Sequence, residues 1–244
     1  MTLLFNAAYE MGLRPAWIVP DSLFLIFVNG REEYVHFGRS PSNSDVGVSL
    51  AKNKYLTRMI LKRNGERNIP FAHPMFLDDA LAFLVAHRKI VAKPLRGSGA
   101  HDIHIITTTA QLRRLPVREY ILEKYIAGRE MRYLVLNGAV IAVHESEYGG
   151  SVAEDRPLRR ISYPRGSWDH RLISDSLRIA NMFGLRFTAI DYLTDIAGHS
   201  YVLEVNTMPG LKWFHAPTLG PVVDVAYLFL KAFYLEGSKA KSYH

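Results

Sequence analysis

The sequence contains no cysteine, and this absence excludes several kinds of chemistry. Without thiols the chain cannot form disulfides, use a thiol nucleophile or hold zinc through cysteine. A membrane-spanning run is also missing, because the longest later apolar run, residues 222–235, is interrupted by Asp224 and Lys231 and is too short to cross a bilayer. The first residues lack a basic start and carry Glu10 in their only apolar run, which argues against a signal peptide. We therefore expect a cytoplasmic protein without a membrane partner.

The positive charge is dispersed rather than gathered in one arm. The formal net charge is +7, and one cluster stands out, namely Arg156, Arg159, Arg160, Arg165 and Arg171. A basic surface attracts phosphates of any kind, but we find none of the aromatic stacking motifs that single-stranded RNA binding favours. A nucleoside triphosphate explains the charge as readily as a polymer would. We therefore expect no nucleic-acid partner, with a basic RNA-binding protein as an alternative.

The most informative stretch is residues 187–210. Apolar and polar residues alternate over 188–193 and again over 201–205, around a turn-forming segment, which predicts a β-hairpin. Glu204 and Asn206 share a face of the second strand, and a suitable register brings Asp191 beside them. Two carboxylates and an amide are hard oxygen ligands that suit magnesium or manganese. The pattern predicts a metal site, with a solvated hairpin as the alternative.

A glycine loop lies between two expected strands. The strand over residues 89–93 leads into PLRGSGAH, and a second strand follows over 103–106. The tip of such a hairpin can place backbone amides against phosphate, and Lys93 at its base adds a positive charge. The same residues could also form an ordinary flexible turn.

The rest of the chain mixes helical and strand patterns. We expect helices over residues 4–11, 50–63, 77–87, 107–115, 172–183 and 221–234, and strands over 16–19, 120–126 and two hairpins centred on Asn29-Gly30 and Asn137-Gly138. In the helix over 50–63 the apolar residues Leu50, Leu56, Met59, Ile60 and Leu61 recur at helical spacing.

Two further expectations concern the centre of the chain. Glu130, Arg132 and Tyr133 could face the same cavity as the metal ligands, the alternative being an ordinary cross-strand ion pair. Residues 145–170 are polar and without periodicity, which is typical of a functional lid or a disordered loop.

Taken together, these segments resemble the ATP-grasp superfamily over roughly residues 45–235. The motifs are AKNKYLTRMILKRNG around Lys54, IVAKPLRGSG around Lys93, ILEKYIAGREMRY over 121–133 and IDYLTD followed by YVLEVNTMPGL at the end. Each is modest alone, but four in this order are specific. The segment EVNTMPGLKWFHAPTLG is most similar to cyanophycin synthetase and to the ATP-grasp part of bifunctional glutathione synthetase, and close to the ribosomal-protein glutamate ligases. His215 lies where cyanophycin synthetase also tends to have a histidine.

The resemblance implies an α+β ATP-grasp fold, in which two α/β lobes with antiparallel sheets hold ATP between them. Residues 1–48 would form a short N-terminal α/β segment, 49–124 the small lobe with the glycine loop, and 125–244 the large lobe with the metal site and a lid.

The resemblance also implies a role for each site residue. The nucleotide-binding set would be Lys54, Lys93, Gly97, Ser98, Gly99, Ile103, Glu123, Lys124, Tyr125, Ile126, Glu130 and Leu203. Within it the lysines and the glycine loop would bind phosphates, residues 123–126 adenine, and Glu130 the ribose. One or two magnesium or manganese ions would be held by Asp191, Glu204 and Asn206. Lys93 and Arg132 would be catalytic, Lys93 at the α- and β-phosphates and Arg132 at the γ-phosphate or the acylphosphate. We also expect Arg159 and Arg160 of the lid to bind an anionic substrate, with a solvated loop as the alternative.

The implied activity is that of an ADP-forming carboxylate–amine ligase that makes an amide or peptide bond through an acylphosphate, on an amino acid or peptide. The alternatives are a regulatory ATP-binding protein without catalysis and a phosphotransferase that uses the same ATP site. The chain could also form a homodimer.

The sequence also departs from the family pattern. Ala189 stands where D-alanine ligases carry arginine, which argues against that activity. Ala100 and Asp102 replace glycines of the loop, and Asp102 would repel phosphates unless it turns outward. The part ahead of the ATP-grasp motifs is shorter than the usual substrate-binding domain, so the acceptor could bind in the lid or on a partner.

Overall fold

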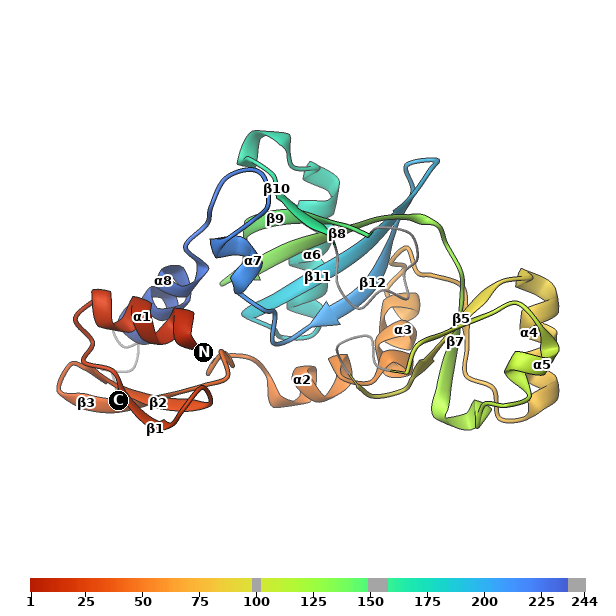
Figure 1. Cartoon of the computed structure of the whole chain (residues 1–244), viewed down its shortest axis with the longest axis horizontal. Coiled ribbons are helices and arrows are strands. Elements are labelled where there is room, and N and C mark those ends of the chain that lie inside the picture. The colour runs from red at the N-terminus through yellow and green to blue at the C-terminus, as the bar shows by residue number, and fades with distance from the viewer. Residues whose placement is uncertain (98–101, 149–157, 237–244) are drawn as a thin grey trace.

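The computed structural model describes residues 1–97, 102–148 and 158–236. These residues form three antiparallel sheets that follow one another along the chain, with helices between and beside them (Figure 1). The mixture confirms the expected α+β class.

The first sheet belongs to the N-terminal segment. It consists of β1 (Ala16–Val19), β2 (Leu23–Val28) and β3 (Arg31–His36), in that spatial order, and is preceded by α1 (Thr2–Glu10). Asn29 and Gly30 have φ angles of 52° and 75°, as the tight turn of a two-residue hairpin requires. The predicted hairpin is therefore confirmed.

Two helices connect this sheet to the second one. α2 (Asp45–Ala51) and α3 (Lys54–Arg63) replace the single helix expected over 50–63, because Asn53 interrupts it and caps α3 through a hydrogen bond from the Leu56 amide. The apolar residues at helical spacing also do not all lie on the buried face of α3. Thr57, Arg58 and Leu61 are buried, whereas Leu56 and Met59 are exposed, since α3 turns polar side chains toward a cleft between the second and third sheets.

The second sheet has the order β4-β7-β5-β6. Its strands and helices are β4 (Phe71–Ala72), α4 (Leu77–His87), β5 (Ile90–Pro94), β6 (His104–Ile106), α5 (Thr109–Leu112), η1 (Val117–Glu119) and β7 (Tyr120–Lys124). Helices α4 and α5 cover one face, and apolar residues such as Leu84, Ile90 and Leu112 form the core between them.

The third sheet is the largest and has the order β10-β9-β8-β11-β12. Its elements are β8 (Gly128–Leu136), β9 (Ala139–Glu147), β10 (Arg159–Ser162), η2 (Arg165–Ser167), α6 (His170–Met182), β11 (Phe187–Asp195) and β12 (Ser200–Asn206). The hairpins at residues 137–138 and 195–200 are confirmed. Strand β10 lies in the stretch expected to be irregular. Its four residues, RRIS, carry too few apolar side chains to give a strand pattern.

Strand alternation gives this sheet two different faces. One face packs on α6 through residues such as Tyr133, Ile190 and Tyr192. The opposite face carries a polar row, one residue from each strand in matching register: Ser162, His144, Arg132, Asp191 and Glu204. Because Tyr133 follows Arg132 directly, it points to the α6 side, and the expectation that it faces the cavity is wrong.

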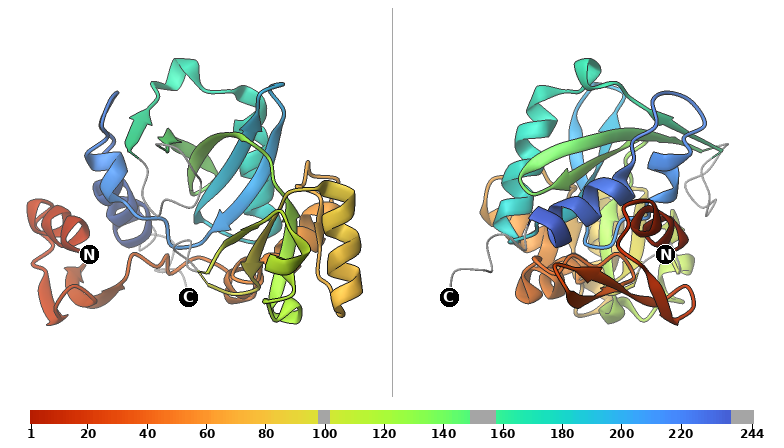
Figure 2. Two further views of the ribbon diagram at one scale, coloured as in Figure 1. Left: turned by 45° about the vertical axis from the view of Figure 1, so that its right-hand side comes forward. Right: turned by 90° about the vertical axis from the view of Figure 1, so that its left-hand side faces the viewer.

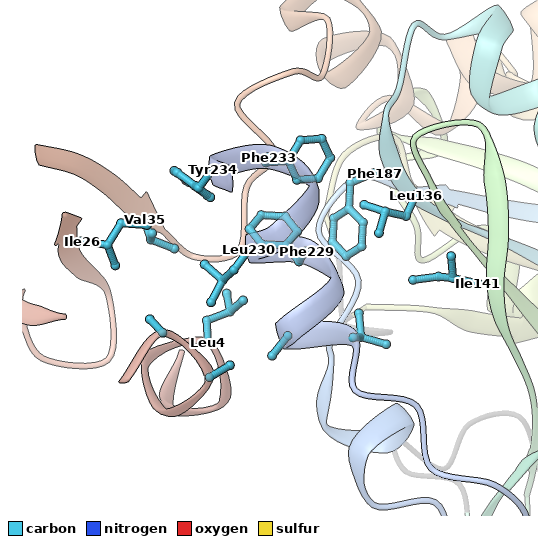
Figure 3. Close-up of a cluster of buried hydrophobic side chains, with 14 of the residues drawn as sticks. Leu4, Ile26, Val35, Leu136, Ile141, Phe187, Phe229, Leu230, Phe233 and Tyr234 are labelled. Carbon is cyan, nitrogen blue, oxygen red and sulfur yellow. The ribbon is translucent and has the colours of Figure 1, made fainter. Parts of the chain in front are cut away.

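The chain ends with α7 (Lys212–His215), α8 (Val225–Leu230) and the π-helical turn η3 (Lys231–Glu236). Helix α8 lies between α1 and the large sheet, where Phe229 contacts Phe187 and Leu230 joins the cluster that contains Leu4 (Figures 2 and 3). The N-terminal segment therefore shares its core with the end of the chain. Over the described ranges, no helix combines the length and the apolar character needed to span a membrane.

Candidate active site

A cavity of about 410 Å³ opens between the large sheet, the second sheet and α3. Most of the residues singled out in the sequence line it: Lys54, Lys93, Gly97, Ile103, Glu123, Lys124, Tyr125, Ile126, Glu130, Arg132, Arg160, Asp191, Leu203, Glu204 and Asn206. Ser98 and Gly99 lie outside the described residues. Arg159 does not line the cavity.

The hairpin β11–β12 brings the three expected metal ligands to one wall. Asp191 lies directly opposite Glu204, and Ala189 opposite Asn206. The Asp191 carboxylate is buried and receives two hydrogen bonds of 2.6 Å from Nε and Nη2 of Arg132. The guanidinium thus already offsets part of the repulsion between the two carboxylates. Within the described ranges no three His, Cys, Asp or Glu side chains form a metal-holding group, so this donor set consists of two carboxylates and one amide.

Glu204 is the carboxylate of this wall without a counter-ion. Its side chain is half-buried and makes no hydrogen bond or ion pair with the residues that the structure describes. Burial and the charge of Asp191 raise the pKa of Glu204, and the nearby cations Lys54, Arg132 and Lys93 oppose this shift. A carboxylate that is disfavoured in its charged form gains most from an added cation. The wall therefore fits a divalent metal ion.

Two lysines lie across the cavity from this wall. Lys93 Nζ forms an ion pair of 2.7 Å with Glu123, and Lys54 Nζ donates to the Gly97 carbonyl at 2.9 Å. Burial lowers the pKa of Lys54, and the charge of Lys93 lowers it further, against the attraction of Glu204 and Glu123. Two cations that repel each other beside a glycine-containing turn can bind a polyanion.

Glu123 is held by two cations in a buried site. Arg58 Nε contacts its other carboxylate oxygen at 2.6 Å. Burial alone would raise the pKa of Glu123, but the charges and hydrogen bonds of Arg58 and Lys93 lower it to about 2. Sequence reasoning missed Arg58. Its spacing from Lys54, one helical turn on the same face, is the signal that could have found it.

The third part of the cavity is apolar and adjoins residues 123–126. Ile69, Val91, Ile103, Leu193 and Leu203 line it, and three of them, Ile69, Val91 and Leu193, were not expected. The amide of Lys124 donates to Pro70 and that of Tyr125 to Lys89, whereas the amide of Ile126 makes no hydrogen bond within the described part of the chain. A planar, polar-edged ligand would find an apolar slot and a spare donor here.

Glu130 lies between the polar row and the apolar slot. Tyr148 donates a hydrogen bond of 2.8 Å to its carboxylate, and Ser146 makes a longer one of 3.4 Å. Burial and Asp191 raise the pKa of Glu130, while the hydrogen bond from Tyr148 opposes this. Tyr148 was missed because it lies in the stretch that we expected to be irregular.

On β10, two residues before Ser162 of the polar row, Arg160 is a buried cation without a carboxylate partner among the described side chains. It is 8% exposed, donates to Ser146, approaches His144 Nε2 at 3.4 Å, and leaves its Nε atom without a partner. Burial and the charges of Arg132 and Arg160 lower the pKa of His144 to about 2, so this ring is neutral and adds no charge. Arg160 can therefore accept an anion.

Arg159 and Asp102 lie away from this cavity. Arg159 precedes Arg160 in β10 and so points to the other face, where it is 58% exposed in its side chain and pairs loosely with Glu147 at 3.8 Å. Asp102 turns outward, where it accepts hydrogen bonds from Tyr120 and from His104. These bonds lower the pKa of Asp102, and Asp102 does not line the cavity. His215 has a structural contact, because its Nε2 accepts from the Ala226 amide at the start of α8.

No family model matches the chain, but curated proteins do. A D-alanine–D-alanine ligase of Pelobacter propionicus is 26% identical over 179 residues, which cover 67% of this chain and 58% of the ligase. The bifunctional glutathione biosynthesis protein GshAB of Listeria welshimeri is 30% identical over 156 residues, or 58% of this chain and 20% of that protein. A probable alpha-L-glutamate ligase of Alkalilimnicola ehrlichii is 25% identical over 213 residues, covering 80% and 68%. The chain thus spans little more than half of the first relative.

Solved structures extend the likeness to the whole architecture. The bifunctional glutathione synthetase of Pasteurella multocida matches 96% of this chain and 44% of its own, with a TM-score of 0.69 and 16% identity. The ATP-grasp ligase PsnB, solved with Mg, ADP and a variant of its minimal precursor, matches 80% of this chain and 62% of its own, with a TM-score of 0.64 and 18% identity. The chain has the ATP-grasp fold, and its sequence is similar to those of ligases for D-alanine, glutathione and glutamate. The ATP-grasp fold confirms the expectation of antiparallel sheets on either side of one cavity.

Proposed function

We propose that this ATP-grasp protein is an ADP-forming carboxylate–amine ligase. The observation that carries the proposal is the convergence of Lys54 and Lys93 on one side of a single cavity with Asp191, Glu204 and Asn206 on the other. Such a site offers cations to phosphates and oxygen ligands to the metal that accompanies them. The names of the relatives, ligases for D-alanine, glutathione and glutamate, support the same class of reaction.

We propose one orientation for the nucleotide in the cavity. Adenine would occupy the apolar slot against residues 123–126, with the spare amide of Ile126 as donor, and Glu130 would bind the ribose. Lys54, Lys93 and the turn at Gly97 would hold the phosphates, as would Ser98 and Gly99. Asp191, Glu204 and Asn206 would hold magnesium or manganese, which neutralises the charge of the transferred phosphoryl group when bound.

The substrate carboxylate would bind at Arg160. Arg132 was expected to contact the γ-phosphate or an acylphosphate, but two of its nitrogens are committed to Asp191, which leaves Arg160 as the buried guanidinium free for an anion. A carboxylate held there would lie on the polar row between Arg132 and the β10 edge. Arg159 would act only from outside the cavity. We infer an amino acid or a peptide as the substrate, because the relatives act on such molecules.

The reaction then needs positioning more than covalent help. A carboxylate oxygen of the substrate attacks the γ-phosphorus, the bond to the β-γ bridging oxygen breaks, and ADP leaves. An amine next attacks the acyl carbon and phosphate departs, with loss of a proton from the amine. Lys93 and Arg160 would orient the reacting groups and stabilise their charge. We assign no side chain as an obligatory base.

The division of the chain follows from these roles. Residues 49–124 would act as the small lobe, 125–244 as the large lobe with the metal site and a lid, and 1–48 as a short N-terminal segment. A cytoplasmic location would suit a reaction that consumes ATP.

The test is an assay for ADP and phosphate release with Mg²⁺-ATP and a panel of amino acids and peptides, with and without an added amine. A ligase releases phosphate only when both a carboxylate substrate and an amine are present, and mass spectrometry shows the amide. A phosphotransferase would yield a phosphorylated product without amine. A regulatory ATP-binding protein would bind nucleotide with no turnover on any pair. Either result would replace the ligase assignment.

A further inference from the structure

Strand β12 contains a β-bulge at the centre of the site. Asp191 pairs with Glu204 but Tyr192 pairs with Val202, so Leu203 is an extra residue in β12. In a regular strand, Leu203 and Glu204 would point to opposite faces. Here both line the cavity, while Val202 and Val205 on either side are buried in the apolar cluster that includes Leu61 of α3. The bulge therefore places Glu204 beside Asp191 and keeps Leu203 in the apolar slot.

Arg58 of α3 holds the carbonyls of this bulge. Its Nη2 donates to the Leu203 carbonyl at 2.9 Å, and its Nη1 donates to the Val202 carbonyl and to Asn68 Oδ1. These carbonyls lie on the outer strand of the large sheet, where the bulge disturbs the ladder. The guanidinium is buried, with 2% of its side chain exposed, so water does not replace these donors.

The same guanidinium reaches the second sheet. Its Nε contacts Glu123 Oε1 at 2.6 Å, and Glu123 Oε2 contacts Lys93 Nζ at 2.7 Å. One side chain therefore connects the backbone next to Glu204 with the carboxylate that orients Lys93. Both ends of this connection are buried, which limits the alternative positions of each partner.

We propose that Arg58 is a positioning residue that fixes the metal-binding half of the site relative to the phosphate-binding half. The proposal rests on the proposed function, because it assumes that Glu204 holds metal and Lys93 holds phosphate. Arg58 itself does not touch the reacting atoms. Its planar fork addresses four acceptors in fixed directions, which an ammonium group cannot do. Groups that orient a metal ligand typically change metal affinity about 10–100-fold when they are replaced.

The test compares Arg58→Lys with Leu61→Val. Leu61 is fully buried in the same helix and does not line the cavity, so its variant reports the effect of disturbing α3 in general. Calorimetry would measure the affinity for Mn²⁺ in the presence of a non-hydrolysable ATP analogue, and thermal unfolding would measure stability. Hydrogen exchange of residues 200–206 would report the bulge.

We expect Arg58→Lys to weaken Mn²⁺ binding at least tenfold and analogue binding with it, and to speed exchange over 200–206. Leu61→Val should lower only the unfolding temperature. Equal metal affinities, within twofold, in the two variants would overturn the proposal. If the wild-type protein binds no nucleotide, the proposed function fails instead, and exchange alone then decides the structural claim: equal exchange over 200–206 in the two variants overturns it.

Discussion

At the scale of single residues, Glu204 differs from two other acidic residues of the cavity, Asp191 and Glu123. Asp191 is paired with Arg132, and Glu123 with Arg58 and Lys93, whereas Glu204 has no such partner in the described structure. A half-buried carboxylate beside another carboxylate costs stability until a cation arrives. The unpaired charge of Glu204 is thus the reason for assigning a metal ion to this wall.

This imbalance predicts opposite effects of Glu204→Gln on stability and on metal binding. Removal of the charge relieves the repulsion from Asp191, so we expect the free energy of unfolding without metal to stay equal or to rise by up to about 1 kcal/mol. Metal-dependent turnover should fall at least a hundredfold, because the metal loses a charged ligand. Calorimetry with Mg²⁺ and denaturant unfolding measure the two effects.

The matched control is Glu147→Gln, a carboxylate of β9 that is 43% exposed in its side chain and lies outside the cavity. It should leave turnover and metal binding unchanged. Normal Mg²⁺ binding by Glu204→Gln would contradict the assignment of this residue.

At the scale of elements, local patterns predicted what local chemistry decides. The turn residues Asn29-Gly30 and Asn137-Gly138 predicted the hairpins β2–β3 and β8–β9. The alternation around Asp191 and Glu204 predicted the hairpin β11–β12. Two features were out of reach. Strand β10 has no apolar pattern and is held by pairing with β9, and the buried face of α3 is polar because it faces the cavity. Arg58 contacts groups 65 and 145 residues away, and such distant contacts leave little signal in a local window.

Strand β10 offers a sharp comparison because its two arginines face opposite sides. Arg160 is buried in the cavity wall and Arg159 is exposed on the other face. If Arg160 binds the substrate carboxylate, Arg160→Ala should raise the KM for the carboxylate substrate at least thirtyfold, since a lost charge-assisted hydrogen bond costs about 2 kcal/mol or more. The KM for ATP should change much less.

Arg159→Ala serves as the control with the same change of charge, and we expect its KM for both substrates to stay within about twofold, because an exposed ion pair contributes little. Steady-state kinetics at saturating Mg²⁺ separate the two variants. Equal effects would mean that the general positive charge of β10, and not the buried position, attracts the substrate.

At the scale of the whole molecule, the two ends of the chain form one core. Leu4 of α1, Ile26 and Val35 of the first sheet, and Phe229 and Leu230 of α8 belong to one apolar cluster that continues to Phe187 and Leu136 of the large sheet (Figure 3). From the sequence we expected residues 1–48 to form a segment separate from the two lobes. Its contact partner lies some 200 residues later, as the hydrogen bond from Tyr234 to the Tyr34 carbonyl illustrates.

A shared core predicts a shared unfolding transition. Leu4 is 2% exposed, so Leu4→Ala should lower the free energy of unfolding by about 2–5 kcal/mol, and the loss should extend to the large lobe. Tyr9→Ala on the same helix is the control, because Tyr9 is 74% exposed and its loss should change stability by less than about 0.5 kcal/mol.

Urea unfolding followed by circular dichroism and by tryptophan fluorescence should give coincident curves for both variants, since Trp17 reports the N-terminal segment and Trp168 and Trp213 report the large lobe. An early, separate fluorescence change in Leu4→Ala, with ATP binding retained, would show that residues 1–36 fold independently of the lobe that they contact.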